Sequence, residues 1–268
     1  MNLRFWVITI VLVLAIGAGI LFRGGSTKKT PSTGLLSASQ SGAAPAPTAV
    51  VSDIASVPTA TFDTIGQGTA SVLPSAITAP ALTENNKPEV YYEGAEYCPY
   101  CATERWAMAV ALARFGTFKN LKVTHSSTTD VYANTQTLSF YGSTYTSDYL
   151  TFTPIELYTD IPSEGGYTTL QTPTTKEQDL ANDYDSDQSI PFIDFGGKYK
   201  VGGATYNPQV LSGLSWGQIA GSLANPSSTT AKGVDGAANT LTAAICKLTN
   251  NQPGNVCDTV IQGLEAKL

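Results

Sequence analysis

Residues 88–113 read PEVYYEGAEYCPYCATERWAMAVALA and carry the clearest structural signal in the chain. Its first five residues, Pro88–Tyr92, are typical of a strand, which Gly94 ends. After the Cys-Pro-Tyr-Cys motif at Cys98–Cys101, apolar residues recur at helical spacing. The stretch therefore predicts a strand, a short turn and a helix over 99–115 that begins at a pair of cysteines.

A cysteine pair at a helix N-terminus is suited to disulfide exchange. The thiolate is the attacking species, and the unpaired N–H groups and dipole of a helix N-terminus lower the pKa of a cysteine there. Cys98 falls at or next to the N-cap, and Pro99 suits the first helical position. Cys101 lies one turn inside, close enough to displace a partner bound to Cys98. We expect Cys98 to be the nucleophile and Cys101 the resolving thiol.

Two other interpretations of the pair stay open, a structural disulfide and half of a zinc site. Zinc needs further ligands, usually a second cysteine pair or histidines. The only histidine is His125, and the other cysteines, Cys246 and Cys257, lie far along the chain. We therefore expect no metal, and no cofactor besides the redox-active cysteines. A single histidine also makes Ser-His-Asp hydrolase chemistry a poor fit.

The N-terminus predicts attachment to a membrane. Phe5–Phe22 form an apolar stretch of 18 residues, near the lower limit for a spanning helix, and no close cleavage site follows. We expect residues 1–23 to be an uncleaved single-pass signal anchor in the cell membrane, with a cleaved signal peptide as the alternative. Four cysteines in two plausible pairs suit an oxidising compartment, so the bulk of the chain is predicted to be extracytoplasmic.

The rest of the chain is acidic. The 268 residues carry a net charge of −6, and without the four basic residues around the anchor 11 basic residues face 21 acidic ones. An acidic domain is a poor partner for nucleic acid, and none is expected. Residues 24–51 are rich in Gly, Ser, Thr, Ala and Pro and predict a low-complexity linker.

Periodicity and turn residues predict the remaining elements. They are a strand at 121–125, a β-hairpin within 137–160 turning near 146–148, a helix at 174–184, a hairpin of 190–195 and 198–201, and helices at 215–223, 231–248 and 255–266. A parallel step from the strand at 88–92 to the strand at 121–125 would give an α/β sheet with right-handed crossovers.

Ile190-Pro191 is the second informative position. A polar residue, a β-branched residue, a proline and then a buried strand follow one another here. This resembles the cis-proline loop of thioredoxin-like folds, which lies opposite the Cys-x-x-Cys motif and holds substrate backbone. We therefore predict a cis bond before Pro191 and count it among the catalytic residues. We expect Ile190 and Tyr100 to bind substrate.

The block around the cysteines, 92–118, closely resembles the thioredoxin-like family catalogued as domain of unknown function 929. The resemblance continues through Ser126-Ser127, Tyr145-Thr146-Ser147, Ile190-Pro191-Phe192, Ala244-Ile245-Cys246-Lys247 and Cys257. It implies a thioredoxin-like α/β fold at 52–268 and a redox role. An inserted β-hairpin region would occupy about 126–188, and extra C-terminal helices about 229–268.

Cys-Pro-Tyr-Cys is also the glutaredoxin motif, and Gly202-Gly203 resembles the glutaredoxin ending. Roughly 90 residues separate Cys101 from Pro191, however, and no basic residue precedes the cysteines closely enough to grip glutathione. We expect protein thiols and disulfides as substrates, together with a redox partner protein. The sequence leaves the direction of electron flow and the oligomeric state open.

Residues near the motif have simpler expected roles. Trp106 is expected in the core. Surface ion pairing is expected for Glu96 and Arg105, the latter with Glu104 or a carboxylate outside the helix. Cys246 and Cys257 are predicted to form a structural disulfide, with a shuttle pair that passes electrons to Cys98 and Cys101 as the alternative.

The leading hypothesis is a membrane-anchored extracytoplasmic thiol–disulfide oxidoreductase that acts through Cys98 and Cys101. The rival is a non-catalytic cell-surface binding or adaptor domain of thioredoxin-like fold. In that case Cys98 and Cys101 would stay closed as a structural disulfide. Reactivity of the pair toward mild reductant and thiol reagents separates the two hypotheses.

Overall fold

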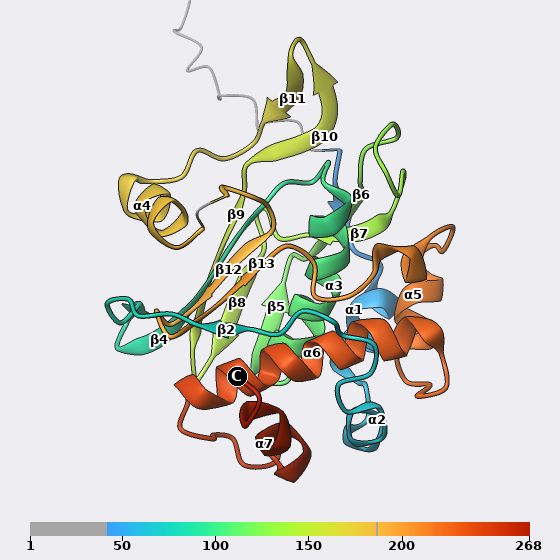
Figure 1. Ribbon diagram of the computed structural model, residues 1–268. Coiled ribbons are helices and arrows are strands. Elements are labelled where there is room, and N and C mark those ends of the chain that lie inside the picture. The colour runs from blue at the N-terminus through green and yellow to red at the C-terminus, as the bar shows by residue number, and fades with distance from the viewer. Residues whose placement is uncertain (1–41, 186) are drawn as a thin grey trace, which may run out of the picture. The chain divides into compact units, whose positions relative to one another are not determined.

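The computed structural model describes residues 42–185 and 187–268 (Figure 1). The helices are α1 Thr48–Ala55, α2 Thr59–Ile65, α3 Pro99–Ala113, α4 Thr175–Tyr184, α5 Trp216–Ser222, α6 Thr229–Leu248 and α7 Thr259–Glu265, with a 3-10 helix η1 at Pro208–Leu211. The strands are β1 Ala44–Pro45, β2 Ser75–Ala76, β3 Thr83–Glu84, β4 Lys87–Gly94, β5 Gly116–Lys119, β6 Lys122–His125, β7 Gln136–Ser139, β8 Thr144–Ser147, β9 Thr151–Glu156, β10 Tyr158–Ser163, β11 Gly166–Thr169, β12 Phe192–Phe195 and β13 Tyr199–Gly202.

β4 lies at the centre of the main sheet. It pairs antiparallel with β12, where Tyr92 is opposite Ile193, and parallel with β9, where Glu93 is opposite Ile155. β13 and then β2 continue the sheet beyond β12, and β3 forms a hairpin with the start of β4. The chain that leaves β4 after Gly94 therefore starts from the middle of the sheet.

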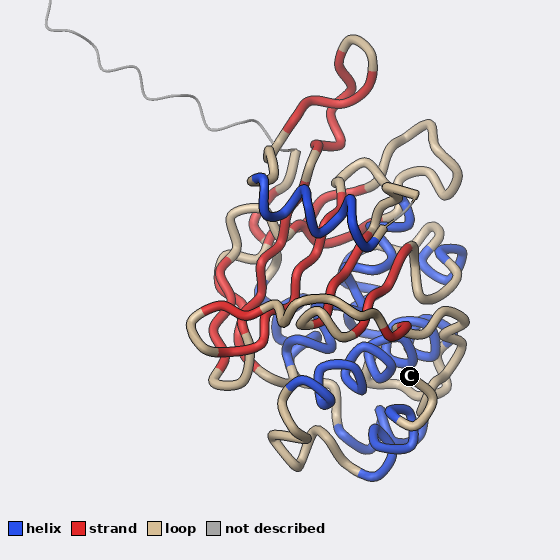
Figure 2. The backbone as a smooth tube through the Cα atoms, turned by 60° about the vertical axis from the view of Figure 1, so that its left-hand side comes forward, coloured by secondary structure: helices blue, strands red, loops and turns tan. Residues whose placement is uncertain are grey.

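Both faces of β4 are covered, because successive side chains of a strand point to opposite faces. Val90 and Tyr92 join the large core that contains α3 and α6. Tyr91 packs on the other face with Phe192 and Ala181, the latter on α4. Figure 2 shows helices on both sides of the strands. This explains the short apolar run Val90–Tyr92 within β4, where neither face meets water.

The parallel partner of β4 differs from the predicted one. The strand at 121–125 is present as β6, but it pairs antiparallel with β1 and β7 in a separate sheet. β9 takes the expected place beside β4. The prediction was wrong because periodicity identifies a strand but carries no information on its partner. β9 also lies inside the range 126–188 assigned to an insertion, so part of that range belongs to the main sheet.

The prediction of a hairpin within 137–160 was also wrong. The two strands on either side of its predicted turn, β8 and β9, do not pair with each other. β8 pairs with β5, and β9 pairs with β4. A hairpin does occur further on, where β10 and β11 pair around Glu164 and Gly165. It projects beyond the main sheet at the top of Figure 1.

Several local predictions are confirmed. The helices predicted at 174–184 and 215–223 are present as α4 and α5, and each begins with a capping box, Thr174 with Glu177 and Ser215 with Gln218. β12 and β13 form the predicted hairpin around Gly196 and Gly197. The last helix is shorter than predicted, because Asp258 caps it and it begins only at Thr259.

The folded domain begins before Ser52. Val50 and Ile54 on α1 are buried in the core, and β1 pairs with β6. The predicted linker over 24–51 thus overlaps the fold at its end. The anchor predicted at 1–23 and the remainder of the linker lie outside the described residues. Within 42–185 and 187–268, no helix combines the length and apolar character that crossing a bilayer needs.

Candidate active site

Cys98 is the N-cap residue of α3. Its backbone is extended, its Sγ accepts the backbone N–H of Cys101 at 3.2 Å, and Pro99 occupies the first helical turn. Its own N–H donates to the Ala95 carbonyl oxygen at 3.2 Å, which closes a tight turn after β4. The sequence favours this turn because the Cys98 side chain supplies the acceptor that an N-cap needs, and the first helical position tolerates Pro99. The predicted placement of Cys98 and Cys101 is confirmed.

The two cysteines are free thiols in unequal surroundings. Cys98 is 5 % exposed, whereas Cys101 is completely buried. Hydrogen bonding from Cys101 lowers the pKa of Cys98, against the opposing effect of burial, and the Arg105 charge adds to the lowering. Burial raises the pKa of Cys101 well above its ordinary value. Cys98 is thus the thiol that ionises first and the one that solvent reaches.

The Ile190–Pro191 segment forms the wall opposite Cys98. The bond between these residues is cis, as predicted. The Cys98 thiol donates to the Ile190 carbonyl oxygen at 3.8 Å, and Ile190 packs on the small cluster of Ala95, Cys98 and Cys101. Pairing of β12 with β4 sets this position, because it aligns Phe192 with Glu93, close to the strand end that leads to Cys98.

A buried ion pair lies behind the cysteines. Arg105 and Glu156 are both fully buried, and two hydrogen bonds of 2.8 Å join them. Arg105 also donates to the Ala95 carbonyl oxygen. The prediction that Arg105 pairs at the surface was wrong, because the ion pair is fully buried. Its partner, Glu156, is a carboxylate outside the helix, which agrees with one of the two predicted partners. Because Arg105 follows Cys101 by four residues, it lies on the same face of α3.

Other residues near the motif follow the predictions in part. Trp106 is fully buried, as expected. Glu96 is buried rather than at the surface, and it accepts a hydrogen bond from the Ser139 hydroxyl at 2.6 Å. His125 lies 3.7 Å from Asp160, with its side chain 40 % exposed. Among residues 42–185 and 187–268, no group of His, Cys, Asp or Glu has the arrangement of a metal site.

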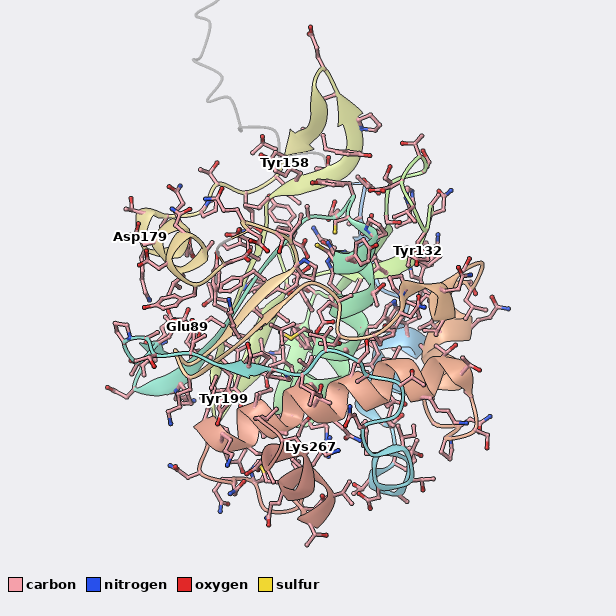
Figure 3. All side chains as sticks on the ribbon, in the orientation of Figure 1. Glu89, Tyr132, Tyr158, Asp179, Tyr199 and Lys267 are labelled. Carbon is pink, nitrogen blue, oxygen red and sulfur yellow. A yellow bond between two sulfur atoms is a disulfide. The ribbon has the colours of Figure 1, made fainter. Side chains whose placement is uncertain are left out.

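Tyrosines surround the Cys98 turn. The Tyr97 ring stacks on Tyr167 of β11 with centroids 4.1 Å apart, and Tyr158 of β10 lies 6.2 Å from Tyr97. Tyr100, expected to bind substrate, is 41 % exposed. Its ring and that of Tyr132 form a T-shaped pair with centroids 6.1 Å apart. Figure 3 shows Tyr158 and Tyr132 in the upper part of the molecule, away from Lys267. The thiol therefore opens onto an aromatic surface.

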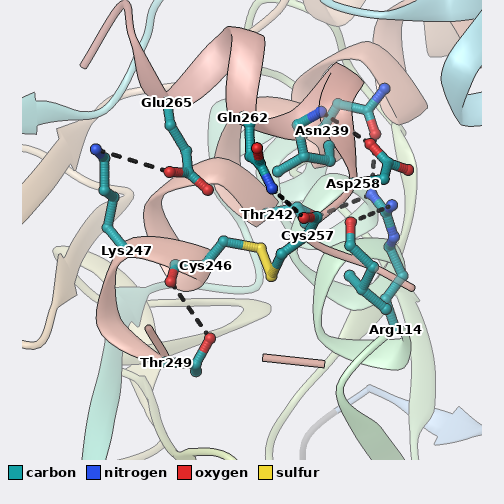
Figure 4. Close-up of a disulfide and its surroundings, with 12 residues drawn as sticks. Arg114, Asn239, Thr242, Cys246, Lys247, Thr249, Cys257, Asp258, Gln262 and Glu265 are labelled. Atoms are coloured by element: carbon teal, nitrogen blue, oxygen red, sulfur yellow. Dashed lines mark hydrogen bonds and ion pairs between the residues drawn. A yellow bond between two sulfur atoms is a disulfide. The ribbon is translucent and has the colours of Figure 1, made fainter. Parts of the chain in front are cut away.

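The second cysteine pair forms a disulfide between α6 and the segment before α7 (Figure 4). Both sulfurs belong to buried residues. Arg114, which caps the C-terminal end of α3, donates to the carbonyl oxygen of Val256, next to Cys257. Cys98 caps the other end of this 15-residue helix, about 22 Å away. Direct exchange between the two pairs would need a large rearrangement, which favours the structural role over the shuttle.

Sequence reasoning missed Glu156 and the tyrosines of β10 and β11. A signal for the buried ion pair was present, since Arg105 falls three residues after Ala102 and four before Ala109, on the apolar stripe of the helix. A cation in such a place needs a buried carboxylate. Which carboxylate supplies it is decided by the pairing of β9 with β4. The tyrosines gave no comparable signal.

These features define an α/β domain with a free Cys-x-x-Cys dithiol at the start of a central helix. A family model described as a domain of unknown function, DUF929, matches residues 75–172 and 165–247. The chain belongs to this family, as the resemblance indicated. No curated protein and no solved structure matches the chain.

Proposed function

We propose that this protein is a thiol–disulfide oxidoreductase of thioredoxin-like fold. The observation that carries the proposal is the position of Cys98: it caps α3, accepts the Cys101 N–H and faces the Ile190 carbonyl oxygen. Helix N-termini with a second cysteine one turn inside are suited to forming a reactive thiolate. The lowered pKa of Cys98 and the raised pKa of Cys101 fit a nucleophile and a resolving thiol.

The arrangement of the sheet supports the fold in this proposal. A central strand leads into the Cys-x-x-Cys helix, and a parallel strand lies beside it. The antiparallel hairpin of β12 and β13 lies on its other side, directly after the cis-proline. α3 and α6 pack on one face, whereas α4 packs on the other. This is the arrangement that we expect of a thioredoxin-like domain with additional strands and helices.

The reaction in the reducing direction has two steps. The Cys98 thiolate attacks one sulfur of a substrate disulfide, forming a mixed disulfide, and the other sulfur leaves as a thiolate that takes up a proton. Cys101 then loses its proton and attacks the Cys98 sulfur. This step forms the Cys98–Cys101 disulfide and releases the first substrate sulfur as a thiol. Two electrons pass to the substrate, and a dithiol reductant must reopen the protein disulfide for turnover.

In the oxidising direction the same steps run backwards, with a disulfide-bearing partner as the oxidant. The reduction potential of the Cys98–Cys101 couple decides which direction prevails. Protein thiols and disulfides remain the proposed substrate class. We further propose attachment to the membrane through residues 1–23 with the domain outside the cytoplasm. The Cys246–Cys257 disulfide supports an oxidising compartment.

Insulin reduction by dithiothreitol tests the activity. Cys98→Ser should abolish the acceleration of disulfide cleavage, and Cys101→Ser should accumulate mixed disulfides that mass spectrometry under non-reducing conditions detects. Full turnover by Cys98→Ser would contradict the proposal. A Cys98–Cys101 disulfide that resists reductant until the protein unfolds would favour the rival adaptor function instead.

A further inference from the structure

A cavity of about 290 Å³ opens beside the Cys98 turn, between Tyr97 and the β10–β11 hairpin. Its lining consists of three tyrosines, one carboxylate and small residues at the hairpin tip. These are Tyr97, Tyr158, Ser163, Glu164, Gly165, Gly166 and Tyr167. The hairpin that forms most of the wall projects beyond the main sheet in Figure 1. The catalytic steps above use none of these side chains.

The cavity is held next to the thiol by direct contacts. Tyr97 adjoins Cys98 in the chain and packs on the cluster that contains both cysteines. Its carbonyl oxygen accepts the N–H of Ser127 at 2.7 Å, and the Tyr167 hydroxyl donates to the Ser127 hydroxyl oxygen at 2.6 Å. Glu96 donates its N–H to the Tyr158 carbonyl oxygen at 2.9 Å. The tyrosine walls are therefore fixed to the turn that carries the nucleophile.

The chemistry of the lining favours a cation. Aromatic faces attract guanidinium and ammonium groups, and a carboxylate at the rim adds a charge partner. Glu164 is the charged residue of the lining, which contains no lysine or arginine. The neighbouring loop, residues 126–135, carries Asp130 and likewise no basic residue. A negatively charged side chain would meet the Glu164 carboxylate, whereas a positively charged one would find a charge partner there.

The surroundings of the cavity suit a peptide. The exposed large hydrophobic side chains of the described domain include Tyr100, Val131, Tyr158 and Ile161. All four belong to segments around Cys98: its own helix, the 126–135 loop and β10. A substrate segment in a mixed disulfide with Cys98 would meet apolar side chains of these segments near the cavity.

We propose that the cavity is a subsite for an arginine or lysine side chain of the substrate, within about two residues of the cysteine that joins Cys98. Each residue of an extended substrate spans about 3.3–3.6 Å. The cavity wall includes Tyr97, the neighbour of Cys98, so a substrate side chain within two residues of the reacting cysteine is close enough to enter it. This inference rests on the proposed function and specifies its substrate class: extended, disulfide-bearing protein segments with a basic residue near the reacting cysteine.

Matched fluorogenic disulfide peptides test the subsite. The peptides differ only in one residue two positions from the cysteine: Arg, Gln or Glu. We expect kcat/KM for the Arg peptide to exceed that for the Glu peptide about tenfold, with Gln between them. Glu164→Gln should shrink the Arg-to-Glu ratio about threefold, as should 0.5 M salt. Glu84→Gln, which removes the same charge from the exposed β3–β4 hairpin, should leave the ratio unchanged.

Tyr158→Ala provides a second variant, since it removes an exposed ring without removing charge. It should lower kcat/KM for the Arg peptide more than for the Gln peptide. Equal rates for the three peptides, or a ratio that Glu164→Gln leaves intact, would overturn the subsite while leaving the oxidoreductase in place. Failure to turn over every peptide and insulin alike would instead overturn the proposed function.

Discussion

Arg105 and Cys98 share one hydrogen-bond acceptor. The guanidinium of Arg105 and the backbone N–H of Cys98 both donate to the carbonyl oxygen of Ala95. Glu156, 51 residues further along the chain, binds the same guanidinium from the end of β9. A buried cation is thus fixed to the turn that presents the nucleophile, and this fixed charge and the hydrogen bonds from Cys101 both stabilise the thiolate of Cys98.

Replacing Cys101 by alanine should raise the pKa of the Cys98 thiol. Hydrogen bonding from Cys101 is the largest cause of the lowered pKa of Cys98, ahead of the opposing effect of burial. The rate of iodoacetamide alkylation, followed against pH, gives the pKa. We expect a higher midpoint than in Cys101→Ser, whose hydroxyl keeps a donor in place. Identical midpoints in the two variants would contradict this account.

Arg105→Met combined with Glu156→Gln should raise the pKa of Cys98, because the Arg105 charge favours the thiolate. Both residues are replaced because a single change leaves a buried charge without its partner, which costs about 3–5 kcal/mol. Alkylation kinetics again give the pKa. Lys247→Met combined with Glu265→Gln, which removes the ion pair between α6 and α7, is the control and should leave the pKa of Cys98 unchanged. A double variant with no rise would show that Arg105 only supports the fold.

Removing the Cys246–Cys257 disulfide should destabilise the protein without changing its activity. The bond closes a loop between residues 11 apart in sequence, so its loss is expected to cost about 3 kcal/mol. A double alanine variant should melt about 6–12 °C lower in calorimetry. Insulin turnover at 25 °C should stay unchanged, because the disulfide lies at the far end of α3. Loss of turnover by a folded variant would instead favour a role for Cys246 and Cys257 as a shuttle pair.

Asp235→Asn should flatten the dependence of stability on pH. Both carboxylate oxygens of Asp235 are buried without a hydrogen-bond partner, and burial raises its pKa to about 8, partly offset by Arg114. The unfolded chain therefore loses this proton near its ordinary pKa of 3.8, while the folded protein keeps it. The folded state is favoured below pH 3.8, and this advantage is progressively lost as the pH rises toward 8.

Urea denaturation measures this effect. Between pH 5 and pH 7 the free energy of unfolding of the unsubstituted protein should fall by about 2 kcal/mol more than that of Asp235→Asn. The variant should keep a smaller slope, because burial also raises the pKa of Glu104 to about 7 and of Asp194 to about 6. Parallel stability curves for the two proteins would mean that Asp235 is ionised in the folded state.

The sequence alone determined the local part of the site. Cys98 at the N-cap, Pro99 in the first turn and the hairpin after Pro191 follow from capping, proline geometry and strand periodicity, all encoded within a few residues. The cysteine arithmetic likewise identified the second pair, which forms the disulfide. Such features are predictable because the residues that cause them are neighbours in the chain.

Which distant segments meet follows from long-range pairing in the fold, which the local sequence pattern does not specify. β9, not the strand at 121–125, lies parallel to β4, and this pairing places Glu156 against Arg105. The β10–β11 hairpin likewise places Tyr167 on Tyr97 beside the nucleophile. Strand periodicity repeats every two residues whatever the partner, so it cannot choose among partners. That choice depends on burying both faces of the sheet and pairing every buried charge, which are properties of the whole fold.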